Sequence, residues 1–445
     1  MELLKYFSQS MLSVMLPARM GKLRELTGNE HSSAQLLARQ QEARFLSLVD
    51  HARANVPYYR DALGGIEVRS LGDIAGIPFL TKRAIQANRE RLKAEGLPPG
   101  RFVPNTTGGS TGEKLEIYSD TNAHSAAFIL RGNTWTGWRP GEKQLQFWGE
   151  SQDLPMARGA YKKFVQTFVH RNTILSSYSM NEENMLDYCR IINRHTPQLI
   201  TGYTSALLLF SKFLMEKKLE VYSPKGIIGS AETLREDHRK TIESAFHCKL
   251  FNRYGCREVG NIAQECSEQK GLHIHVEHNL VEVVDENGRP CKPGETGEIV
   301  LTGLDNYAFP FIRYKVGDLG VLSDRTCACG RGLPMLESVE GRVWDVIVGA
   351  NGNRLVGTFW LVEDVRGIRE YQVIQENYGS LVIKLVVDRT FTNDDKQLLF
   401  GHVRERCGNK MKVELQMLDN IPLTQGGKRR FIISHVSPFV ERQAP

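Results

Sequence analysis

The sequence has no apolar run that approaches the roughly 18–20 residues needed by a membrane-spanning helix. It also has no low-complexity segment and no internal repeat. Its 57 Lys and Arg residues against 51 Asp and Glu residues give a formal net charge of +6, which is modest for 445 residues. Such a balance suits a small phosphate-bearing ligand and does not call for nucleic acid. We therefore expect neither a membrane span nor a nucleic-acid partner.

An export signal and a disulfide framework are also missing. Apolar residues recur at helical spacing in 1–20, but Lys5, Gln9 and Ser10 interrupt them and no small-residue cleavage site follows. We therefore expect a docking helix there. Eight cysteines in a long chain without an export signal favour a reducing compartment, so the predicted location is the cytoplasm.

The pattern of elements indicates an α/β protein with unequal domains. Between 144 and 255, short strands alternate with helices, which predicts βαβ units and parallel sheet. From Leu280 the pattern changes to antiparallel hairpins, and after Trp344 it becomes a compact α+β unit. We predict a helical region over 1–100 and a core with mixed or parallel sheets and a β-rich subdomain over 101–343. A small, mobile α+β domain is predicted over 344–445.

A loop rich in glycine and hydroxyl residues spans 105–114. Its three glycines let the backbone curl so that successive N–H groups point at one anion, and its hydroxyls add donors. It lacks the G-x-x-x-x-G-K-[ST] spacing of a Walker loop. A polyphosphate site and a plain hairpin tip both remain open. The residues that would cradle phosphates are Gly109, Ser110, Thr111 and Gly112.

Two turns follow predicted strands at the edge where open α/β sheets bind ligands. The first comprises Gly229, Ser230, Ala231 and Glu232, and a plain βα turn is its alternative reading. The second runs from Tyr254 and Gly255 to Glu258. Glu258 is a candidate for Mg²⁺, which takes one or two carboxylates beside phosphate oxygens. A salt bridge from Glu258 to Arg257 or Arg253 is the alternative.

Further along, Asp318 is expected at a strand end, where a carboxylate can accept both hydroxyls of a ribose. An Asp-Leu-Gly turn without a ligand is equally ordinary. Arg342 and Asp345 lie at the predicted domain junction. Arg342 is a candidate for contact with a phosphate or a ribose, and Asp345 is a candidate hinge. Lys428 lies in a basic loop, 422–430, that is either functional or simply solvated.

A C-x-C knuckle, Cys327 and Cys329, is the sharpest metal signal. In a cytosolic protein such a pair indicates metal more than a disulfide. A closed tetrahedral zinc site needs four ligands. Cys266 and His273 are the preferred partners, with His275 and His278 as alternatives. Two reduced cysteines in a turn are the other reading.

The order of these motifs resembles the adenylate-forming superfamily, the acyl-CoA synthetases and adenylation domains. The Cys266/His273 and Cys327/Cys329 pairs resemble the phenylacetate–coenzyme A ligase branch. Three segments are similar to CapK-like proteins associated with surface-polysaccharide gene sets: 56–59, 202–207 and 371–375. The resemblance covers nearly the whole chain after about residue 40.

The resemblance implies a role for each motif. The glycine loop would cradle the phosphates of ATP, and Lys428 would be a catalytic lysine on the small domain, swinging in about Asp345. Glu258 would hold Mg²⁺, Asp318 would bind the ribose hydroxyls with help from Arg342, and zinc would be structural. The adenine would be lined by Ser230, Ala231, Glu232, Tyr254 and Gly255.

The implied activity is that of an AMP-forming acid–thiol ligase, which joins a small carboxylic acid to coenzyme A through an acyl-adenylate. Transfer of the acyl group to an amine or a carrier is the first alternative, and a non-catalytic nucleotide-binding relative is the second. Trp148, Tyr178 and Tyr203 are candidate walls of an acyl pocket, which favours a flat or aromatic acid, although they also suit a core. The oligomeric state stays open, with a homodimer as one option.

Overall fold

The structure, a computed structural model, describes most of the chain. The described residues are 11–106, 115–148, 171–177, 180–342, 346–356, 359–362, 364–422 and 431–436. No helix within these ranges is long and apolar enough to cross a membrane.

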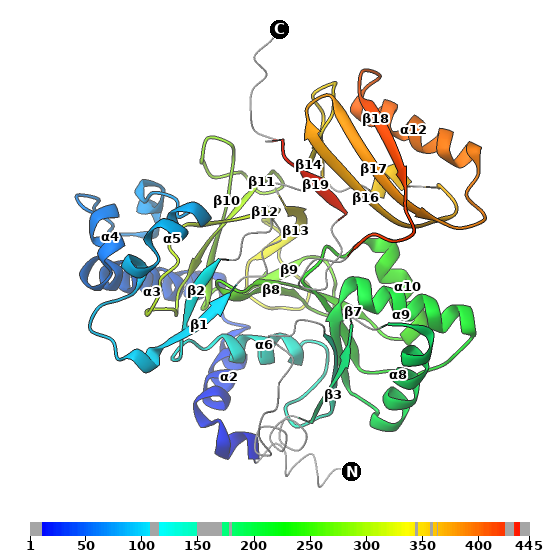
Figure 1. Ribbon diagram of the computed structural model, residues 1–445. Coiled ribbons are helices and arrows are strands. Elements are labelled where there is room, and N and C mark those ends of the chain that lie inside the picture. The colour runs from blue at the N-terminus through cyan, green and yellow to red at the C-terminus, as the bar shows by residue number, and fades with distance from the viewer. Residues whose placement is uncertain are drawn as a thin grey trace.

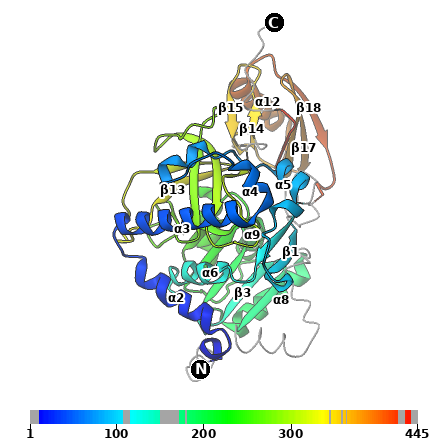
Figure 2. The same ribbon diagram turned by 90° about the vertical axis from the view of Figure 1, so that its left-hand side faces the viewer.

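The N-terminal part is helical, and its helices begin where the sequence offers a cap. The Ser33 side chain accepts a hydrogen bond from the Leu36 amide at the start of α3, and Thr81 does the same for Ala84 at the start of α5. Figure 2 shows α3 and α4 across the face of the molecule turned toward the viewer, with α2 below them. The main elements are α2 (Pro17–Asn29), α3 (Ala34–Asn55), α4 (Pro57–Ala62), α5 (Lys82–Asn88), and the 3-10 turns η1 (Leu71–Gly76), η2 (Glu90–Leu92) and η3 (Pro99–Arg101).

An antiparallel hairpin carries the glycine-rich loop. Its strands pair from Phe102 opposite Asp120 to Thr106 opposite Glu116. The loop itself, 107–114, lies outside the described residues. The elements here are β1 (Phe102–Thr106), β2 (Glu116–Asp120) and the helix α6 (Ser125–Thr134), which packs against α2.

Within the described residues, one 11-stranded sheet runs through the large part of the molecule in the order β10-β11-β12-β13-β9-β8-β7-β6-β5-β3-β4. Five neighbouring strands at the β4 end are parallel, as the alternation of strands and helices predicts. Helices α8, α9 and α10 lie beside them (Figure 1) and bury an apolar core that includes Phe210 and Phe246. The elements are β3 (Gln144–Trp148), β4 (Asn172–Ser176), α8 (Glu182–His195), β5 (Leu199–Tyr203), α9 (Thr204–Lys217), β6 (Gly226–Ser230), α10 (Glu236–Phe246) and β7 (Leu250–Cys256).

The sheet becomes antiparallel at the pairing of β7 with β8. The remaining strands share a core with the N-terminal helices, in which Phe45 and Leu48 of α3 pack with Ile299 and Leu301 of β11. The mixed sheet confirms the predicted α/β class. The strands are β8 (Gly260–Glu265), β9 (Leu272–Ile274), β10 (Asn279–Val284), β11 (Thr296–Gly303), β12 (Tyr314–Ser323) and β13 (Met335–Arg342).

The C-terminal part has its own sheet, ordered β18-β17-β16-β19, and its own core, in which Leu399 and Val403 of α12 pack with Ile383. It lies at the top right in Figure 1, apart from the parallel half of the large sheet. Its elements are β14 (Val346–Val348), β15 (Arg354–Val356), α11 (Phe359–Val362), β16 (Ile368–Asn377), β17 (Ser380–Val387), α12 (Asn393–Cys407), β18 (Lys412–Met417) and β19 (Ile432–Ser434).

Candidate active site and metal site

The turn between β7 and β8 brings two acidic side chains of the sequence analysis into one cluster. Glu258 lies in this turn, and its Oε1 accepts a hydrogen bond of 2.9 Å from the hydroxyl of Tyr314. Tyr254, near the end of β7, donates from its hydroxyl to Oδ2 of Asp318 on β12 at 2.8 Å. Two tyrosines therefore each bind one carboxylate at adjoining parts of the sheet.

Electrostatic coupling confirms that these groups are neighbours. Burial raises the pKa of the Cys256 thiol well above its usual value, and the nearby charges of Glu258 and Asp318 raise it further. Burial also raises the pKa of Tyr314, with Glu258, Cys256 and Asp318 adding to the shift. The thiol and the phenol therefore stay protonated near neutral pH.

Asp318 does not lie at a strand end, so that expectation is wrong. It is inside β12, which runs from Tyr314 to Ser323 and pairs on both sides. Gly317 has φ +85°, and the register shifts at several points along β12, so the Gly-Asp-Leu-Gly residues form an irregular strand instead of a turn. The backbone of Asp318 pairs with that of Arg342.

Two arginines were the alternative salt-bridge partners of Glu258, and within the described residues Arg253 is engaged elsewhere, whereas a bridge with Arg257 stays a prediction. The Arg253 guanidinium donates to Gln264 Oε1 at 2.9 Å and to the Asn133 side chain. Burial lowers its pKa to about 10. The Arg253 side chain thus connects β7 to β8 and α6.

The turn after β6 is held by its neighbour along the sheet. Ala231 has φ +67°, a strained value for a residue with a Cβ, and such strain concentrates at functional sites. The Glu232 carboxylate accepts hydrogen bonds from the amide and the hydroxyl of Ser205, at 2.6 and 2.8 Å. Ser230 Oγ lies 3.4 Å from the carbonyl oxygen of Arg253 and donates to it. Glu232 therefore ties its turn to the start of α9.

Two aromatic side chains stand at the ends of β3 and β5. The rings of Trp148 and Tyr203 stack with centroids 4.6 Å apart and an interplanar angle of 29°. Tyr203 is 1% exposed, so its ring is in the core, whereas Trp148 is partly exposed. Both strand ends lie at the same carboxyl edge as Ser230, because the register pairs Tyr203 with Ser230.

Several residues predicted to form the site lie outside the part of the chain that the structure describes. These are the loop residues Gly109, Ser110, Thr111 and Gly112, the pocket candidate Tyr178, the junction residues Trp344 and Asp345, and Lys428; the side chain of Arg342 lies outside it as well. Their roles stay predictions.

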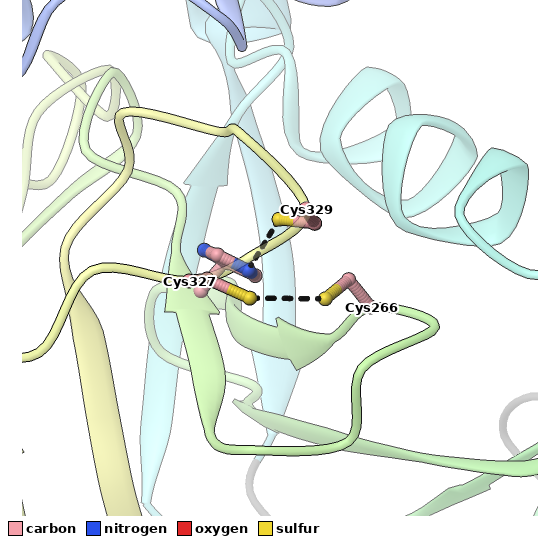
Figure 3. Close-up of side chains that lie close together, drawn as sticks. Cys266, Cys327 and Cys329 are labelled. Carbon is pink, nitrogen blue, oxygen red and sulfur yellow. Dashed lines mark hydrogen bonds between the residues drawn. The ribbon is translucent and has the colours of Figure 1, made fainter.

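The four preferred metal ligands meet in one cluster. The ligand atoms of Cys266, His273, Cys327 and Cys329 all lie within 4.8 Å of one another. Figure 3 shows Cys266 and Cys327 facing each other, with 3.6 Å between their sulfur atoms, and Cys329 Sγ lies 3.3 Å from His273 Nε2. Zn–S bonds of about 2.3 Å in a tetrahedron set sulfur atoms about 3.8 Å apart, so the cluster suits zinc.

The surroundings of the cluster fix its ligands. His273 Nδ1 donates to the Leu333 carbonyl oxygen at 3.4 Å, which leaves Nε2 for a metal. Burial lowers the pKa of His273 to about 4, so the ring is neutral. The alternatives are excluded, because His275 contacts Arg131 at 2.6 Å and His278 contacts Asp305 at 2.5 Å, both outside the cluster.

The knuckle also binds the N-terminal helices. The carboxylate of Glu30 accepts from the Trp135 indole at 2.8 Å and from Arg331 at 3.2 Å. The Gly332 amide donates to the Glu30 carbonyl oxygen at 3.1 Å. The turn between α2 and α3 is therefore attached to the residues that directly follow Cys329.

Comparisons of the sequence with known proteins find relatives of both of the expected kinds. Residues 351–435 match the CapK C-terminal domain. The chain is 24% identical to Protein CapK of Staphylococcus aureus, covering 89% of each chain. It is 26% identical to a phenylacetate-coenzyme A ligase of Thermus thermophilus, over 88% of this chain and 95% of the relative.

A solved structure shows the same fold. The 2-hydroxyisobutyryl-CoA ligase, in a postadenylation state with an adenylate, has a TM-score of 0.73 at 17% identity and covers 92% of both chains. The same ligase in the thioesterification state, at the same coverage, has a TM-score of 0.60.

These findings define the class: the chain has the fold of the adenylate-forming superfamily. Within that superfamily it is a homologue of CapK and of the phenylacetate–coenzyme A ligases.

Proposed function

We propose that the chain is an ATP-dependent carboxylate ligase that forms an acyl-adenylate and then an acyl–coenzyme A thioester. The observation that carries this proposal is the convergence of Tyr254, Asp318, Glu258 and Tyr314 beside the carboxyl edge of the parallel strands. That edge is where open α/β sheets bind nucleotides. The coenzyme A ligases among the relatives support the same reaction class.

The nucleotide would span the β6 turn and the β7–β8 turn. Its ribose hydroxyls would bind Asp318, replacing the Tyr254 hydroxyl as a partner or sharing the carboxylate with it. Arg342, whose backbone pairs with that of Asp318, would assist. The adenine would lie against the backbone and side chains of Ser230, Ala231, Glu232, Tyr254 and Gly255.

The phosphates would face the β1–β2 hairpin, whose loop would supply donors from Gly109, Ser110, Thr111 and Gly112. Glu258 fits Mg²⁺, because it offers a hard oxygen ligand beside the expected phosphates. When bound, Mg²⁺ would neutralise charge on the phosphate oxygens. Lys428 would bring a further positive charge to the α-phosphate.

The reaction would proceed in two displacements. An oxygen of the substrate carboxylate attacks the α-phosphorus of ATP, and pyrophosphate leaves with its bonding electrons. The thiol of coenzyme A, on losing its proton, then attacks the acyl carbon, and AMP leaves. Two anions meet in the first step, so fixed cations and N–H donors at the phosphoryl oxygens are the main source of acceleration.

The small domain would reposition between the steps. We place its boundary at residue 344, with Asp345 as the hinge, because the C-terminal sheet has a separate core. The 2-hydroxyisobutyryl-CoA ligase has been solved in a postadenylation state and in a thioesterification state, and we infer two arrangements for this chain by analogy. One rotation about the hinge would withdraw Lys428 and admit the thiol.

Zinc in the cysteine–histidine cluster would be structural, since four protein ligands leave no open position for a substrate. All eight cysteines are free, which suits a reducing compartment such as the cytoplasm.

A pyrophosphate-release assay over a broad panel of carboxylic acids, including aryl acids, tests the ligase proposal. We expect ATP-dependent release with at least one acid, and consumption of coenzyme A with the same acid. No release with any acid would contradict the proposal, and absence of ATP binding by calorimetry would favour a non-catalytic relative.

A second candidate keeps the first step but passes the acyl group to an amine or a carrier. The similarity to CapK, both along most of the chain and in the C-terminal domain, motivates this candidate. Release of pyrophosphate without consumption of coenzyme A, and with consumption of an amine, would select this candidate.

A further inference from the structure

Tyr314 has no role in the sequence analysis, yet it is the residue that contacts Glu258. It is 0% exposed, and its hydroxyl donates to Glu258 Oε1 at 2.9 Å across 56 residues of sequence. Its ring packs edge-on against Phe311, with centroids 5.4 Å apart and an interplanar angle of 62°. A buried phenol whose hydroxyl donates a hydrogen bond to one carboxylate fixes the orientation of that carboxylate.

The backbone on both sides of Tyr314 is fixed as well. The Leu80 amide donates to the Arg313 carbonyl oxygen at 3.0 Å, and the Lys315 amide donates to the Leu80 carbonyl oxygen at 2.9 Å. These two hydrogen bonds make a parallel bridge between Leu80 and Tyr314. Tyr314 therefore cannot shift along the strand without breaking contacts with the N-terminal region.

Arg313 sets the turn that aims Tyr314 at the site. It has φ +51°, a left-handed value that is strained for a residue with a side chain. The strain is held by its guanidinium, which is buried and binds the Glu282 carboxylate at 2.8 and 3.1 Å. The same guanidinium donates to the carbonyl oxygens of Ala75 and Ile77, at 3.1 and 2.8 Å.

The hydrogen bond from Tyr314 engages one of the two carboxylate oxygens of Glu258. Among the described residues, the hydrogen bond that the structure gives Glu258 is the one from Tyr314, and it goes to Oε1. The second oxygen, Oε2, keeps its lone pairs for a cation. A half-buried carboxylate with one oxygen held by a phenol is a preorganised ligand for Mg²⁺.

We propose that Tyr314 is a positioning residue that holds the Glu258 carboxylate in the orientation needed to bind the Mg²⁺ of Mg·ATP. This inference rests on the proposed function, because it assigns the cation to Glu258. Tyr314 acts through Glu258 and touches neither the nucleotide nor the acid. Tyr254 is its counterpart for Asp318, so the two phenols divide the site into a cation half and a ribose half.

The division predicts separate defects for two matched variants. Tyr314→Phe removes one hydroxyl and keeps the ring, so the Mg²⁺ concentration for half-maximal pyrophosphate release rises by about tenfold or more, as the loss of a hydrogen bond to a charged group implies. Its affinity for ATP in the presence of EDTA stays unchanged. Tyr254→Phe alters the affinity for ATP even in EDTA and leaves the Mg²⁺ midpoint in place.

Direct metal binding provides a readout that does not depend on turnover. Titration of Mn²⁺ into the protein with ATP, followed by electron paramagnetic resonance, measures the cation affinity of each variant. We expect weaker Mn²⁺ binding in Tyr314→Phe and in Glu258→Gln. The double variant should be no worse than Glu258→Gln alone, because Tyr314 acts through that carboxylate.

Tyr59→Phe controls for the loss of a buried phenol. Its hydroxyl donates to the Pro310 carbonyl oxygen at 3.1 Å and accepts from the Ile312 amide at 3.0 Å, so its removal lowers stability without touching Glu258. If the Mg²⁺ midpoint and the Mn²⁺ affinity are unchanged in Tyr314→Phe, the inference about Tyr314 is overturned and the proposed ligase function is not affected. A wild-type chain that binds no ATP would overturn the proposed function and the inference together.

Discussion

The amide and the hydroxyl of Ser205 both donate to the carboxylate of Glu232, so one side chain joins two turns at the carboxyl edge of the sheet. Ser205 lies in the first turn of α9, where a negative charge is favoured by the exposed amides and by the helix dipole. Glu232 lies beside Ala231, the strained residue of the β6 turn. The carboxylate thus supports the strain on one turn with the amides of the next.

This pairing predicts that Glu232→Ala lowers the free energy of unfolding by about 1–2 kcal/mol, as for the loss of a helix cap. Glu232→Gln should cost less, because the amide oxygen still accepts from Ser205. Urea unfolding measures both changes. Glu216→Ala, an exposed change near the other end of α9, serves as the control and should be neutral or slightly stabilising. Equal stability of all three variants would contradict the capping role.

The contact between the knuckle and the N-terminal helices is tested at Gly332. A Cβ at this position would lie 1.9 Å from the carbonyl oxygen of Ser32, which is backbone and cannot move aside cheaply. Gly332→Ala should therefore destabilise the chain by about 1–3 kcal/mol, with increased amide exchange in the turn at residues 30–33. Gly28→Ala is the matched control, since nothing lies within 4 Å of its Cβ and helix α2 should gain slightly.

The metal site predicts about one zinc per chain by elemental analysis of protein prepared without chelator. Cys329→Ser should lose most of this zinc and lower the melting temperature, because the knuckle would no longer hold the turn attached to Glu30. Cys291→Ser, which lies outside the cluster, should keep its zinc. Full metal content in a Cys327→Ser/Cys329→Ser protein would show that the cluster does not bind the ion.

Asp120, at the base of the β1–β2 hairpin, should make the free energy of unfolding depend on pH. Asp120 is buried, which by itself raises its pKa, but hydrogen bonds from Arg101 and from the Asn122 and Ala308 amides outweigh burial and lower the pKa below its usual value. Because the folded pKa is depressed, the stabilisation is complete above the unfolded pKa and is lost as pH falls through the folded pKa.

Asp120→Asn should therefore cost about 2–3 kcal/mol near neutral pH. The difference from the wild type should shrink below about pH 4, where the unfolded wild-type chain binds a proton at Asp120 before the folded chain does. Urea unfolding at a series of pH values measures it. A difference that is constant across this range would mean that the ionised carboxylate is not the source of the stabilisation.

Features that depend on residues close together in the sequence could be predicted from the sequence. The alternation of strands and helices located the parallel strands, and Ser33 and Thr81, two residue types that favour N-cap positions, cap α3 and α5. The sequence also predicted which four side chains meet, because few residue types bind zinc and the candidates could be chosen by their chemistry.

Sequence reasoning failed where long-range pairing decides the structure. Asp318 was expected at a strand end, but pairing with β11 and β13 continues β12 beyond it to Ser323. Tyr314 was missed because its role depends on a turn 56 residues away. The left-handed backbone of Arg313, which aims Tyr314, is set by buried contacts that no local pattern reveals.

The mobile-domain hypothesis predicts a specific loss of the first half-reaction when Lys428 is replaced. Lys428→Ala should reduce acid-dependent pyrophosphate release by about a hundredfold or more, because a positive charge at the developing phosphoryl charge is removed. Stability in urea should stay unchanged, since a single loop lysine contributes little to folding. The thioester-forming step, measured from a chemically prepared acyl-adenylate and coenzyme A, should be far less affected, because the rotation would withdraw Lys428 before that step.

Lys410→Ala, which changes an exposed lysine of the same C-terminal part, is the matched control and should keep both rates. Equal losses in both half-reactions would contradict a lysine that serves only adenylation, and a variant with full pyrophosphate release would remove Lys428 from the catalytic machinery.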